Sequence, residues 1–433
     1  MSTVSPAPLP LSHAEYARYG RQLVLPGFGV EAQLRLCEAR VLVVGAGGLG
    51  CPAIQYLAAA GVGHITIVDD DVVEASNLAR QILHTDSRVG MPKAESACIA
   101  GRAINPHVSL EPVVAALSAA NAQQLISAHD IVLDCTDNVL ARYLISDAAV
   151  LSDVQVVSGA AQGIEGQLVV LHRYSPAVDA DCLLPAREGK QKSQERGPCY
   201  RCLFPVAPAP EDVTDCSDGG VLGAITGLVG TMQALETVRL LAGVGDVTPT
   251  AMTMVNPLAF PPYRSVKLRP RRAATCRSCG DGEAAGGPSV ITSLESEDYV
   301  SFCRLTPRAP RNAGIERLSA QALRDTIARD PHAVLVDVRP EVEFGIAHLS
   351  GSHNLPFTTL RRNPSDALAK LDELAGAEAQ DVYLVCRRGN DSVTAAALLQ
   401  QEAAKQGRDA LRIQDLRGGL RAWSAMDANM PLY

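Results

Sequence analysis

The chain has 433 residues, and its 39 Lys and Arg against 47 Asp and Glu leave a formal net charge of −8 at pH 7. At about 150 residues per domain, this length predicts two or three domains rather than one small module. The negative charge disfavours a general nucleic-acid-binding surface, so direct nucleic-acid binding is not expected. Aromatic residues make up only 4% of the chain, which argues against a platform for stacking single-stranded bases.

The cysteine content and the first residues point to a reducing compartment. Twelve cysteines in a chain of this length are too sparse for a small secreted disulfide scaffold, so we expect reduced thiols used for metal binding or catalysis. The start, MSTVSPAPLPLSHAEY, lacks the basic region and apolar core of a signal peptide. A cytoplasmic location is therefore the expectation.

Residues 41–68 carry no Asp, Glu, Lys or Arg and by length alone could span a bilayer. Glycines and Pro52 divide this stretch into VLVVG, an Ala-rich helical run and HITIV. Two β-branched runs around a helical run are typical of a strand, a helix and a second strand in a buried parallel sheet. We therefore expect no membrane span.

The rest of the chain continues this alternation. Apolar strand-like runs recur to about residue 280, with helical runs between them: VLVVG, HITIV, DIVLDCTDN, VQVVSGA and QLVVLHRY. This pattern predicts a doubly wound α/β domain over residues 1–280, with a polar, mobile surface insertion at 173–198. Residues 281–313 are rich in Pro, Gly and Ser at both ends, which predicts a flexible linker. The α/β pattern then restarts, so residues 314–433 are expected to form a second, smaller domain.

A glycine-rich turn stands between the first strand run and the Ala-rich helical run. It comprises Gly45, Ala46, Gly47, Gly48, Leu49 and Gly50. Glycines let the backbone approach a phosphate, and the N-terminus of the following helix contributes N–H donors and positive potential. Asp69 ends the next strand run, where a carboxylate can bind ribose hydroxyls. These features alone fit an NAD-dependent dehydrogenase as well as an ATP-binding enzyme.

A segment beyond Asp69 favours a triphosphate because it brings an Asn and two cations. It comprises Ser76, Asn77, Leu78, Ala79 and Arg80, followed by Lys93. A dinucleotide that exchanges a hydride needs few such charges, whereas a triphosphate that loses pyrophosphate needs several. Asp137 and Asn138 follow the strand run at 130–134, at the sheet edge where ligands of α/β proteins bind. Mg²⁺ prefers carboxylate and phosphate oxygens, so Asp137 is a candidate magnesium ligand.

Two Cys-x-x-Cys pairs predict a zinc site. They are Cys199 with Cys202 and Cys276 with Cys279. Two such pairs can present four thiolates to one tetrahedral Zn²⁺ with no open position, which indicates a structural role. Redox pairs or unrelated thiols are the alternative. A run of basic residues without an acid surrounds the second pair: Arg264, Lys267, Arg269, Arg271, Arg272 and Arg277. These cations either offset the negative thiolates or, as a second interpretation, contact tRNA.

Two further cysteines precede predicted helices. Cys216 lies just before the helical run that starts at Val221, and a helix N-terminus lowers a thiol pKa and favours the nucleophilic thiolate. Cys216 is therefore a candidate acyl acceptor, with a buried structural cysteine as the alternative. Cys386 begins CRRGNDS between the strand run VYLV and a helix. Backbone N–H groups of such a loop can surround a persulfide and stabilise its negative charge as they would an oxyanion.

Together these motifs resemble the ubiquitin-activating-type adenylyltransferases, in particular those that act on sulfur carriers. The resemblance rests on GAGGLG, Asp69, SNLARQ, Lys93, DCTDN, both Cys-x-x-Cys pairs and TDCSDGGVLG. The C-terminal part resembles a rhodanese domain through DVR at 337–339, Cys386, and LRGGL followed by Trp423. The order of the two parts resembles the adenylyltransferase and sulfurtransferase family of tRNA thiolation and molybdenum cofactor synthesis. The resemblance covers about residues 13–280 and 315–425.

This resemblance implies a Rossmann-like adenylation domain with a structural zinc site, followed by a small α/β rhodanese domain. By analogy the glycine-rich turn, Asp69, residues 76–80, Lys93, Asp137 and Asn138 bind ATP and Mg²⁺. Arg21, in YGRQ, resembles the arginine that the family inserts into the partner subunit's nucleotide site, which implies a homodimer. The loop of Cys386 ends Gly-Asn-Asp where many thiosulfate-using rhodaneses carry a further Arg. A persulfide handed over by a cysteine desulfurase is therefore the expected sulfur donor.

The implied reaction is adenylation of a ubiquitin-like sulfur carrier that ends in Gly-Gly, followed by sulfur transfer from a Cys386 persulfide. The product is a C-terminal thiocarboxylate for 2-thiolation of the tRNA wobble uridine, for molybdopterin synthesis, or for both. Cys216 acts before or after Cys386. Three alternatives stay open at this point. They are an activating enzyme that passes a ubiquitin-like modifier to protein lysines by thioester chemistry, an NAD-dependent dehydrogenase, and a scaffold with inactive domains.

Overall fold

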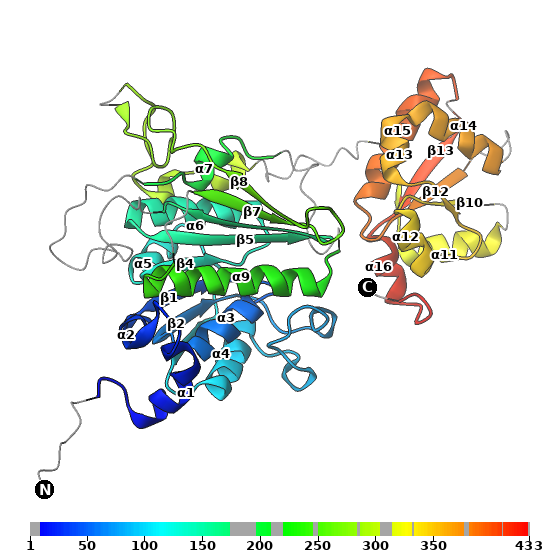
Figure 1. The fold of residues 1–433 in the computed structure, drawn as a ribbon. Helices are drawn as coiled ribbons and strands as arrows, with labels where there is room; N and C mark the ends of the chain where they lie inside the picture. The colour runs from blue at the N-terminus through cyan, green and yellow to red at the C-terminus, as the bar shows by residue number, and fades with distance from the viewer. Residues whose placement is uncertain are drawn as a thin grey trace, which may run out of the picture. The chain divides into compact units, whose positions relative to one another are not determined.

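The computed structural model describes residues 9–173, 196–208, 220–245, 250–283, 286–303, 314–330, 333–375, 381–408 and 410–431. The chain divides into two compact units, unit 1 over Met1–Thr306 and unit 2 over Pro307–Tyr433. Figure 1 labels the helices and strands of both units. Within the described ranges no helix is long and apolar enough to span a membrane.

Unit 1 is built on an eight-stranded mixed sheet of order β3-β2-β1-β4-β5-β6-β7-β8. Its strands are β1 (Arg40–Val44), β2 (His64–Val68), β3 (Ser109–Val113), β4 (Ile131–Asp134), β5 (Gln155–Gln162), β6 (Glu165–Leu171), β7 (Ala251–Val255) and β8 (Tyr263–Lys267). The pairings from β3 to β5 are parallel, and those from β5 to β8 are antiparallel. The chain runs outward from β1 to β3 and then returns to β4 on the other side of β1. Ligands of open α/β sheets bind at such a reversal, outside the carboxyl ends of the strands.

Helices cover both faces of this sheet (Figure 1). They are α1 (His13–Leu23), α2 (Gly29–Glu38), α3 (Gly50–Ala60), α4 (Lys93–Ile104), α5 (Ala122–Ser127), α6 (Val139–Ser152), α7 (Tyr200–Leu203), α9 (Gly223–Ala242) and α10 (Tyr299–Phe302). Short 3-10 turns occupy Ala75–Asn77, Asp86–Arg88 and Leu294–Ser296. In β1, Val41 and Val43 join the core that includes residues of α3 and α9, whereas Leu42 and Val44 join the core that includes α6. Burial on both faces explains the unbroken apolar run of this strand.

Helical runs are expected between all the strands, and between β5 and β6 this expectation is wrong. The two strands pair antiparallel from Val156 opposite Leu171 to Gln162 opposite Glu165, so only two residues link them. Gly163 in that link has φ +58°, a left-handed conformation that glycine adopts without steric cost. A short buried apolar run reads the same in a hairpin as in a parallel sheet, so the pattern did not distinguish the two.

Residues 281–303 belong to the segment expected to be a linker, and their described part packs on unit 1. Leu294, Tyr299 and Cys303 are buried in the core that includes α6 and β5. The hydroxyl of Tyr299 donates to Asp147 in α6, with 3.0 Å between Oη and Oδ2. Residues 304–313 and most of the predicted insertion, residues 174–195, lie outside the described residues.

Unit 2 contains a five-stranded sheet of order β11-β10-β12-β13-β9, in which every pairing is parallel. Its strands are β9 (Arg317–Leu318), β10 (Val334–Asp337), β11 (His353–Asn354), β12 (Asp381–Val385) and β13 (Arg412–Leu416). Its helices are α11 (Ala320–Arg329), α12 (Glu341–Ile346), α13 (Phe357–Arg362), α14 (Pro364–Ala375), α15 (Asp391–Lys405) and α16 (Gly419–Ser424). The central strand β12 ends directly before Cys386. The predicted α/β class is confirmed in both units.

Candidate functional site

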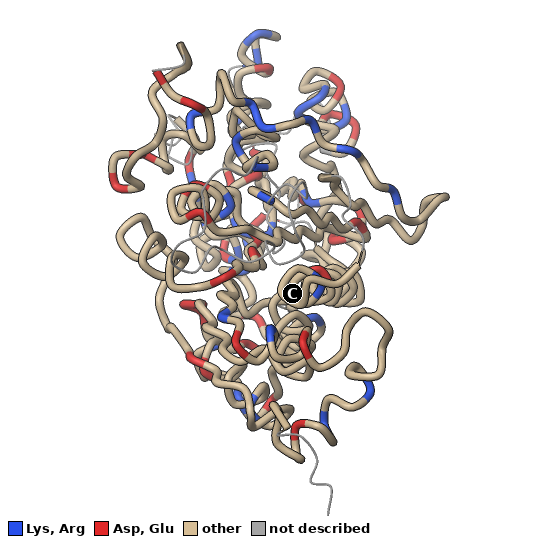
Figure 2. Tube along the Cα trace, turned by 60° about the vertical axis from the view of Figure 1, so that its left-hand side comes forward, with Lys and Arg blue, Asp and Glu red and all other residues tan. Residues whose placement is uncertain are grey.

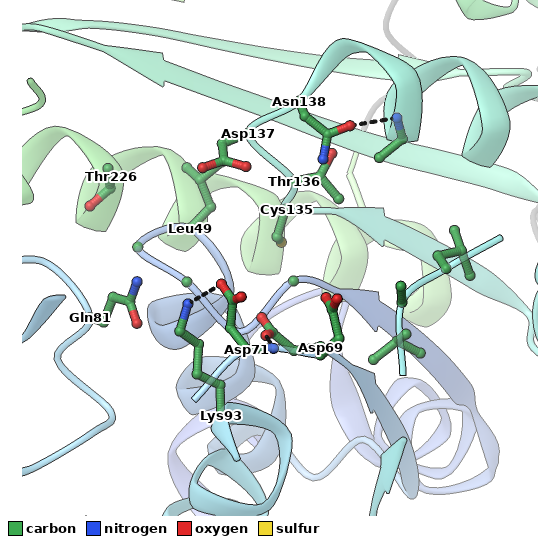
Figure 3. A pocket seen from close by; sticks show the side chains of 18 of the residues that line it. Leu49, Asp69, Asp71, Gln81, Lys93, Cys135, Thr136, Asp137, Asn138 and Thr226 are labelled. Carbon is green, nitrogen blue, oxygen red and sulfur yellow. Dashed lines mark hydrogen bonds and ion pairs between the residues drawn. The ribbon is translucent and has the colours of Figure 1, made fainter. Parts of the chain in front are cut away.

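A pocket of about 410 Å³ lies at the carboxyl ends of β1, β2 and β4. Its walls are the glycine-rich turn, the segments after β2, β3 and β4, and the start of α9. Of the predicted residues, its lining includes Gly45, Gly47, Gly48, Asp69, Arg80, Lys93, Asp137 and Asn138. Figure 3 shows Asp137 on one side of the pocket, with Lys93, Asp71 and Asp69 on the other. The strand ends therefore bring together residues that are far apart in the sequence.

The glycine-rich turn fits between two other elements because Gly45 and Gly48 lack side chains. Gly45 has φ +97°, and a Cβ there would lie 2.8 Å from the carbonyl oxygen of Cys135. A Cβ on Gly48 would lie 2.9 Å from Oγ1 of Thr226 in α9. Gly50 packs against the backbone of the turn itself and does not line the pocket. The glycines thus serve the close approach of neighbouring elements as well as access for a phosphate.

Ala46 in this turn is held through both its N–H and its carbonyl. Its N–H donates to Oδ2 of Asp69 at 2.7 Å, and its carbonyl oxygen lies 2.9 Å from Nε2 of the buried His84. A carbonyl can only accept, so Nε2 carries the proton and Nδ1 accepts from Ser96 Oγ at 2.8 Å. Burial lowers the pKa of His84, which keeps the imidazole neutral. Because Ser96 belongs to α4, His84 ties the turn to the helix that starts at Lys93.

Asp69 lines the pocket and also accepts hydrogen bonds from two backbone N–H groups. Its Oδ2 accepts from Ala46, and its Oδ1 accepts the N–H of Asp71 at 2.9 Å. Burial raises the pKa of Asp69 above its usual value. The predicted ribose contact would therefore be made by a carboxylate that the protein already holds in place.

Lys93 is 6% exposed and supplies a buried cation to the pocket. Its Nζ lies 2.7 Å from Oδ2 of Asp71, whose side chain is 69% exposed. An exposed carboxylate is weakly restrained, so an incoming phosphate can take over the ammonium group from Asp71. Asp71 was not among the predicted residues, although the run Asp69, Asp70, Asp71 directly after a strand was a usable signal.

Among residues 76–80, Arg80 lines the pocket, and Ser76 and Asn77 bind its guanidinium. Asn77 is buried, and its Oδ1 accepts from Nη2 of Arg80 at 3.2 Å. The carbonyl of Ser76 accepts from Nη1 of Arg80 at 3.3 Å, whereas the hydroxyl of Ser76 donates to Glu74. Leu78 and Ala79 do not reach the pocket. Gln81 does line it, and it was not predicted.

The loop after β4 presents Asp137 to the pocket. Beneath it the buried carboxylate of Asp134 accepts from the N–H and hydroxyl of Thr136 at 3.1 and 2.7 Å, and from the hydroxyl of Ser158 at 2.7 Å. Asn138 caps α6, because its Oδ1 accepts the N–H of Ala141 at 2.8 Å (Figure 3). This leaves the exposed carboxylate of Asp137 as the oxygen donor of the loop that is suited to Mg²⁺.

Of the two predicted catalytic residues Arg21 and Cys216, only Arg21 lies in a part of the chain that the structure describes. Arg21 is exposed on α1 and does not line the pocket of its own chain. The helix that carries it is anchored by Tyr19, whose buried hydroxyl accepts from Asn105 Nδ2 at 2.9 Å. Cys216 lies in residues 209–219, outside the described residues.

The sulfur of Cys386 lies in a cradle of backbone N–H groups. The N–H groups of Gly389 and Ser392 point at Sγ from 3.1 and 3.4 Å. Cys386 is 2% exposed, and its loop connects β12 to α15, so the positive end of that helix faces the sulfur. Gly389 has φ +82°, and a Cβ there would lie 2.7 Å from the nitrogen of Gly418. This arrangement stabilises negative charge on sulfur through backbone N–H groups.

The four predicted zinc ligands meet although they come from two distant segments. Ligand atoms of Cys199, Cys202, Cys276 and Cys279 all lie within 4.8 Å of one another. Two of the sulfur pairs are 3.5 and 3.3 Å apart, close to the ~3.8 Å that four Zn–S bonds of about 2.3 Å impose on a tetrahedron. A hydrogen bond from Cys199 lowers the pKa of Cys202 to about 7, and the N–H of Arg272 adds to this effect. The donor set thus fits a structural Zn²⁺.

The basic run around the second cysteine pair is partly neutralised. Arg271 pairs with Asp281 and Arg277 with Glu297, each at 2.7 Å. Arg264, Lys267, Arg269 and Arg272 are exposed. Elsewhere acidic and basic residues are interspersed along the chain (Figure 2).

Comparison with known proteins accounts for nearly the whole chain. Residues 19–278 match the ThiF family, and residues 319–426 match the rhodanese-like domain. The chain is 42% identical over 429 residues to the adenylyltransferase and sulfurtransferase MOCS3 of Drosophila sechellia, covering 98% of this chain and 86% of that protein. It is 42% identical over 450 residues to the adenylyltransferase and sulfurtransferase uba4 of Pyricularia oryzae, with 98% and 88% covered. For UBA4 of Yarrowia lipolytica the identity is 40% over 427 residues, with 98% and 97% covered.

Proposed function

From the premise that this chain belongs to the ThiF family and carries a rhodanese-like domain, we propose that it is an adenylyltransferase and sulfurtransferase acting on a ubiquitin-like sulfur carrier. The relatives that match along both units carry these two activities in their names. One observation carries the proposal for this chain. A nucleotide-sized pocket with a buried cation, Lys93, occurs in the same chain as a cysteine, Cys386, whose sulfur is surrounded by N–H donors.

The first step is adenylation of the carrier's C-terminal glycine. A carboxylate oxygen forms a bond to the α-phosphorus of ATP, the bond from that phosphorus to the bridging oxygen breaks, and pyrophosphate leaves. The carboxylate is already ionised, so no strong general base is needed, and positioning and charge stabilisation dominate. Lys93 and Arg80 supply positive charge from within the pocket, and Arg21 of the partner subunit supplies it in a homodimer. Mg²⁺ at Asp137 would neutralise part of the triphosphate charge.

The second step moves sulfur to the activated carrier. Cys386 thiolate attacks the sulfane sulfur of a donor persulfide, such as that of a cysteine desulfurase, and the donor leaves as a thiolate. The terminal sulfur of the Cys386 persulfide then bonds to the acyl carbon, and AMP leaves with the oxygen. Cys216 thiolate attacks Sγ of Cys386 and releases the carrier as a thiocarboxylate, leaving a disulfide that a cellular dithiol reduces. In the reverse order, Cys216 first holds the acyl group as a thioester, which the persulfide attacks.

The product and the metal have separate roles. The carrier thiocarboxylate is the sulfur source for 2-thiolation of the tRNA wobble uridine and for molybdopterin synthesis. The four cysteines would leave a bound Zn²⁺ no open coordination position, so the metal would cross-link residues 199–202 and 276–279 and would supply no chemical step.

The test is intact-mass spectrometry of a Gly-Gly-ending carrier after incubation with the protein, Mg-ATP and a persulfide donor. We expect the carrier to gain the mass difference between sulfur and oxygen with the wild type. Cys386→Ala should abolish this gain but retain ATP–pyrophosphate exchange, whereas Lys93→Gln should lose both. Persistence of the gain in Cys386→Ala would contradict the proposal.

The same experiment separates the alternatives for Cys216 and for the product. An acyl group trapped on Cys216 in the Cys386→Ala protein favours the order in which Cys216 acts first. Carrier joined to lysines, with no sulfur gain in the wild type, would instead indicate conjugation by thioester chemistry.

A further inference from the structure

Arg317, which is distant in sequence from Cys386, contacts the loop that follows Cys386. Arg317 lies on β9 directly opposite Asp415 on the neighbouring parallel strand β13. Its guanidinium binds Asp415 through two hydrogen bonds, Nε to Oδ1 at 2.8 Å and Nη2 to Oδ2 at 2.9 Å. The side chain of Asp415 is fully buried, and its carboxylate raises the pKa of Arg317. The pair is therefore ionised and fixed in orientation.

Each member of this pair contacts one of the two residues whose N–H groups hold the sulfur. Nη2 of Arg317 donates to the carbonyl of Gly389 at 2.6 Å, and the N–H of Gly389 points at Sγ of Cys386. Oδ2 of Asp415 accepts the hydroxyl of Ser392 at 3.1 Å, and both the N–H and the hydroxyl oxygen of Ser392 lie 3.4 Å from Sγ. The ion pair is thus linked to the sulfur through Gly389 and through Ser392.

These contacts bear on residues that would otherwise be free to reorient. Glycine has the widest range of backbone conformations of all residue types. The left-handed conformation of Gly389 is the one that points its N–H at the sulfur. The Ser392 hydroxyl can rotate, and Asp415 holds its proton away from the sulfur. Burying a carboxylate is costly unless it is paired, so a buried ion pair is weak evidence of a role in stability. Its clear geometric consequence here is that the donors around Cys386 are oriented before a sulfur arrives.

We propose that Arg317 and Asp415 are positioning residues for the sulfur of Cys386, acting through Gly389 and Ser392. This inference rests on the proposed function, in which Cys386 holds the transferred sulfur as a persulfide. Arg317 is then a cation from outside the loop that helps to preorganise it. The end of the loop itself, Asn390 and Asp391, carries no cation.

The test uses Arg317→Lys in the full-length protein. Lysine keeps the positive charge, but it lacks the planar fork that binds Asp415 and Gly389 at once. We expect the alkylation rate of reduced Cys386, followed by peptide mass spectrometry against pH, to fall about tenfold at neutral pH, with the midpoint raised by about one unit.

The matched control is Arg412→Lys. Arg412 also bridges two strands of this sheet, through Asp381 at 2.8 Å, but at the opposite end from Cys386. Its alkylation profile should superimpose on that of the wild type. Hydrogen exchange of the peptide spanning 386–392 should be faster in Arg317→Lys alone.

The outcomes separate this proposal from the one it rests on. An alkylation profile of Arg317→Lys that coincides with the wild type, with unchanged exchange of the 386–392 peptide, would overturn the positioning role. Thiocarboxylate formation by Cys386→Ala would instead overturn the proposed function, and the alkylation profile would still report on the pair.

Discussion

His84 shapes the nucleotide pocket without lining it. Its two ring nitrogens bind the carbonyl of Ala46 and the hydroxyl of Ser96, so the glycine-rich turn and α4 share one buried side chain. This arrangement requires Nδ1 to accept, which only the neutral imidazole can do. Protonation would turn Nδ1 into a donor, so the Ser96 hydroxyl would have to reorient, and it would place a charge in a buried site.

A pH dependence of stability follows. Burial lowers the pKa of His84, so between that value and about 6.5 the unfolded chain binds a proton that the folded chain does not. The contribution to the free energy of unfolding is complete above about pH 6.5 and declines as the pH falls through this window. Urea unfolding from about pH 7.5 to 5.5 should give a flatter pH dependence for His84→Gln than for the wild type.

The exposed His107 provides the control for this prediction. His107→Gln should keep the wild-type slope. His129 is also buried with a lowered pKa, so the His84 variant should retain part of the dependence. Equal slopes in the wild type and His84→Gln would contradict the assignment.

At the scale of elements, the packing of α9 determines the shape of the pocket. A Cβ on Gly223 would lie 2.4 Å from the carbonyl oxygen of Ala79, and one on Gly230 would meet the backbone of Leu49. Gln233 in the same helix donates to the carbonyls of Asp134 and Val157 at 2.8 and 3.0 Å. One helix thus supports the glycine-rich turn, the Arg80 segment and the loop after β4.

Gly48→Ala tests this close packing. Its Cβ would lie 2.9 to 3.1 Å from three side-chain atoms of Thr226, so the turn must shift. We expect ATP affinity, measured by calorimetry with a non-hydrolysable analogue, to fall about tenfold because overpacking costs about 1–3 kcal/mol. Adding Thr226→Ala should restore part of the affinity, since it removes two of the three atoms.

Gly227→Ala is the control for the same helix. No heavy atom lies within 4 Å of a Cβ at Gly227, so ATP affinity should be unchanged. A loss of affinity in Gly48→Ala that Thr226→Ala does not relieve would assign the effect to the phosphate contact instead.

At the scale of the whole molecule, the two proposed chemical functions reside in different compact units of the chain. The nucleotide pocket and the four-cysteine cluster belong to unit 1, and the Cys386 loop belongs to unit 2. The cluster ties residues 199–202 to residues 276–279, so a metal bound there cross-links unit 1 over a long stretch of chain. Binding free energy of a structural metal contributes directly to folding.

Cys279→Ser should therefore affect the two units differently. We expect loss of bound zinc, measured by mass spectrometry of the metal, and a decrease in the stability of unit 1 on the order of several kcal/mol. The alkylation rate of Cys386 in unit 2 should not change. Cys37→Ser, outside the cluster, should retain the zinc. Full zinc content in Cys279→Ser would rule out the four-cysteine site.

The family and the α/β class could be predicted from local patterns, because each motif is contiguous and its chemistry depends on residue type. GAGGLG after a strand, the two Cys-x-x-Cys pairs and CRRGNDS before a helix are motifs of this kind. The expected strand, helix and strand of residues 41–68 are β1, α3 and β2. The hairpin of β5 and β6 was missed because an apolar run carries no information about the direction of its partner.

Contacts between distant segments could not be predicted in this way. His84, Asp71 and Thr226 act on the pocket through neighbours that the sheet order brings close, and Arg317 meets Asp415 only because β9 pairs with β13. The sequence alone determines the residue types available to bind phosphate, metal and sulfur, because these residue types depend on composition and spacing within a motif. Which backbone groups are aimed at Cys386, and which side chains hold the glycine-rich turn, depend on strand order and packing, which no single segment encodes.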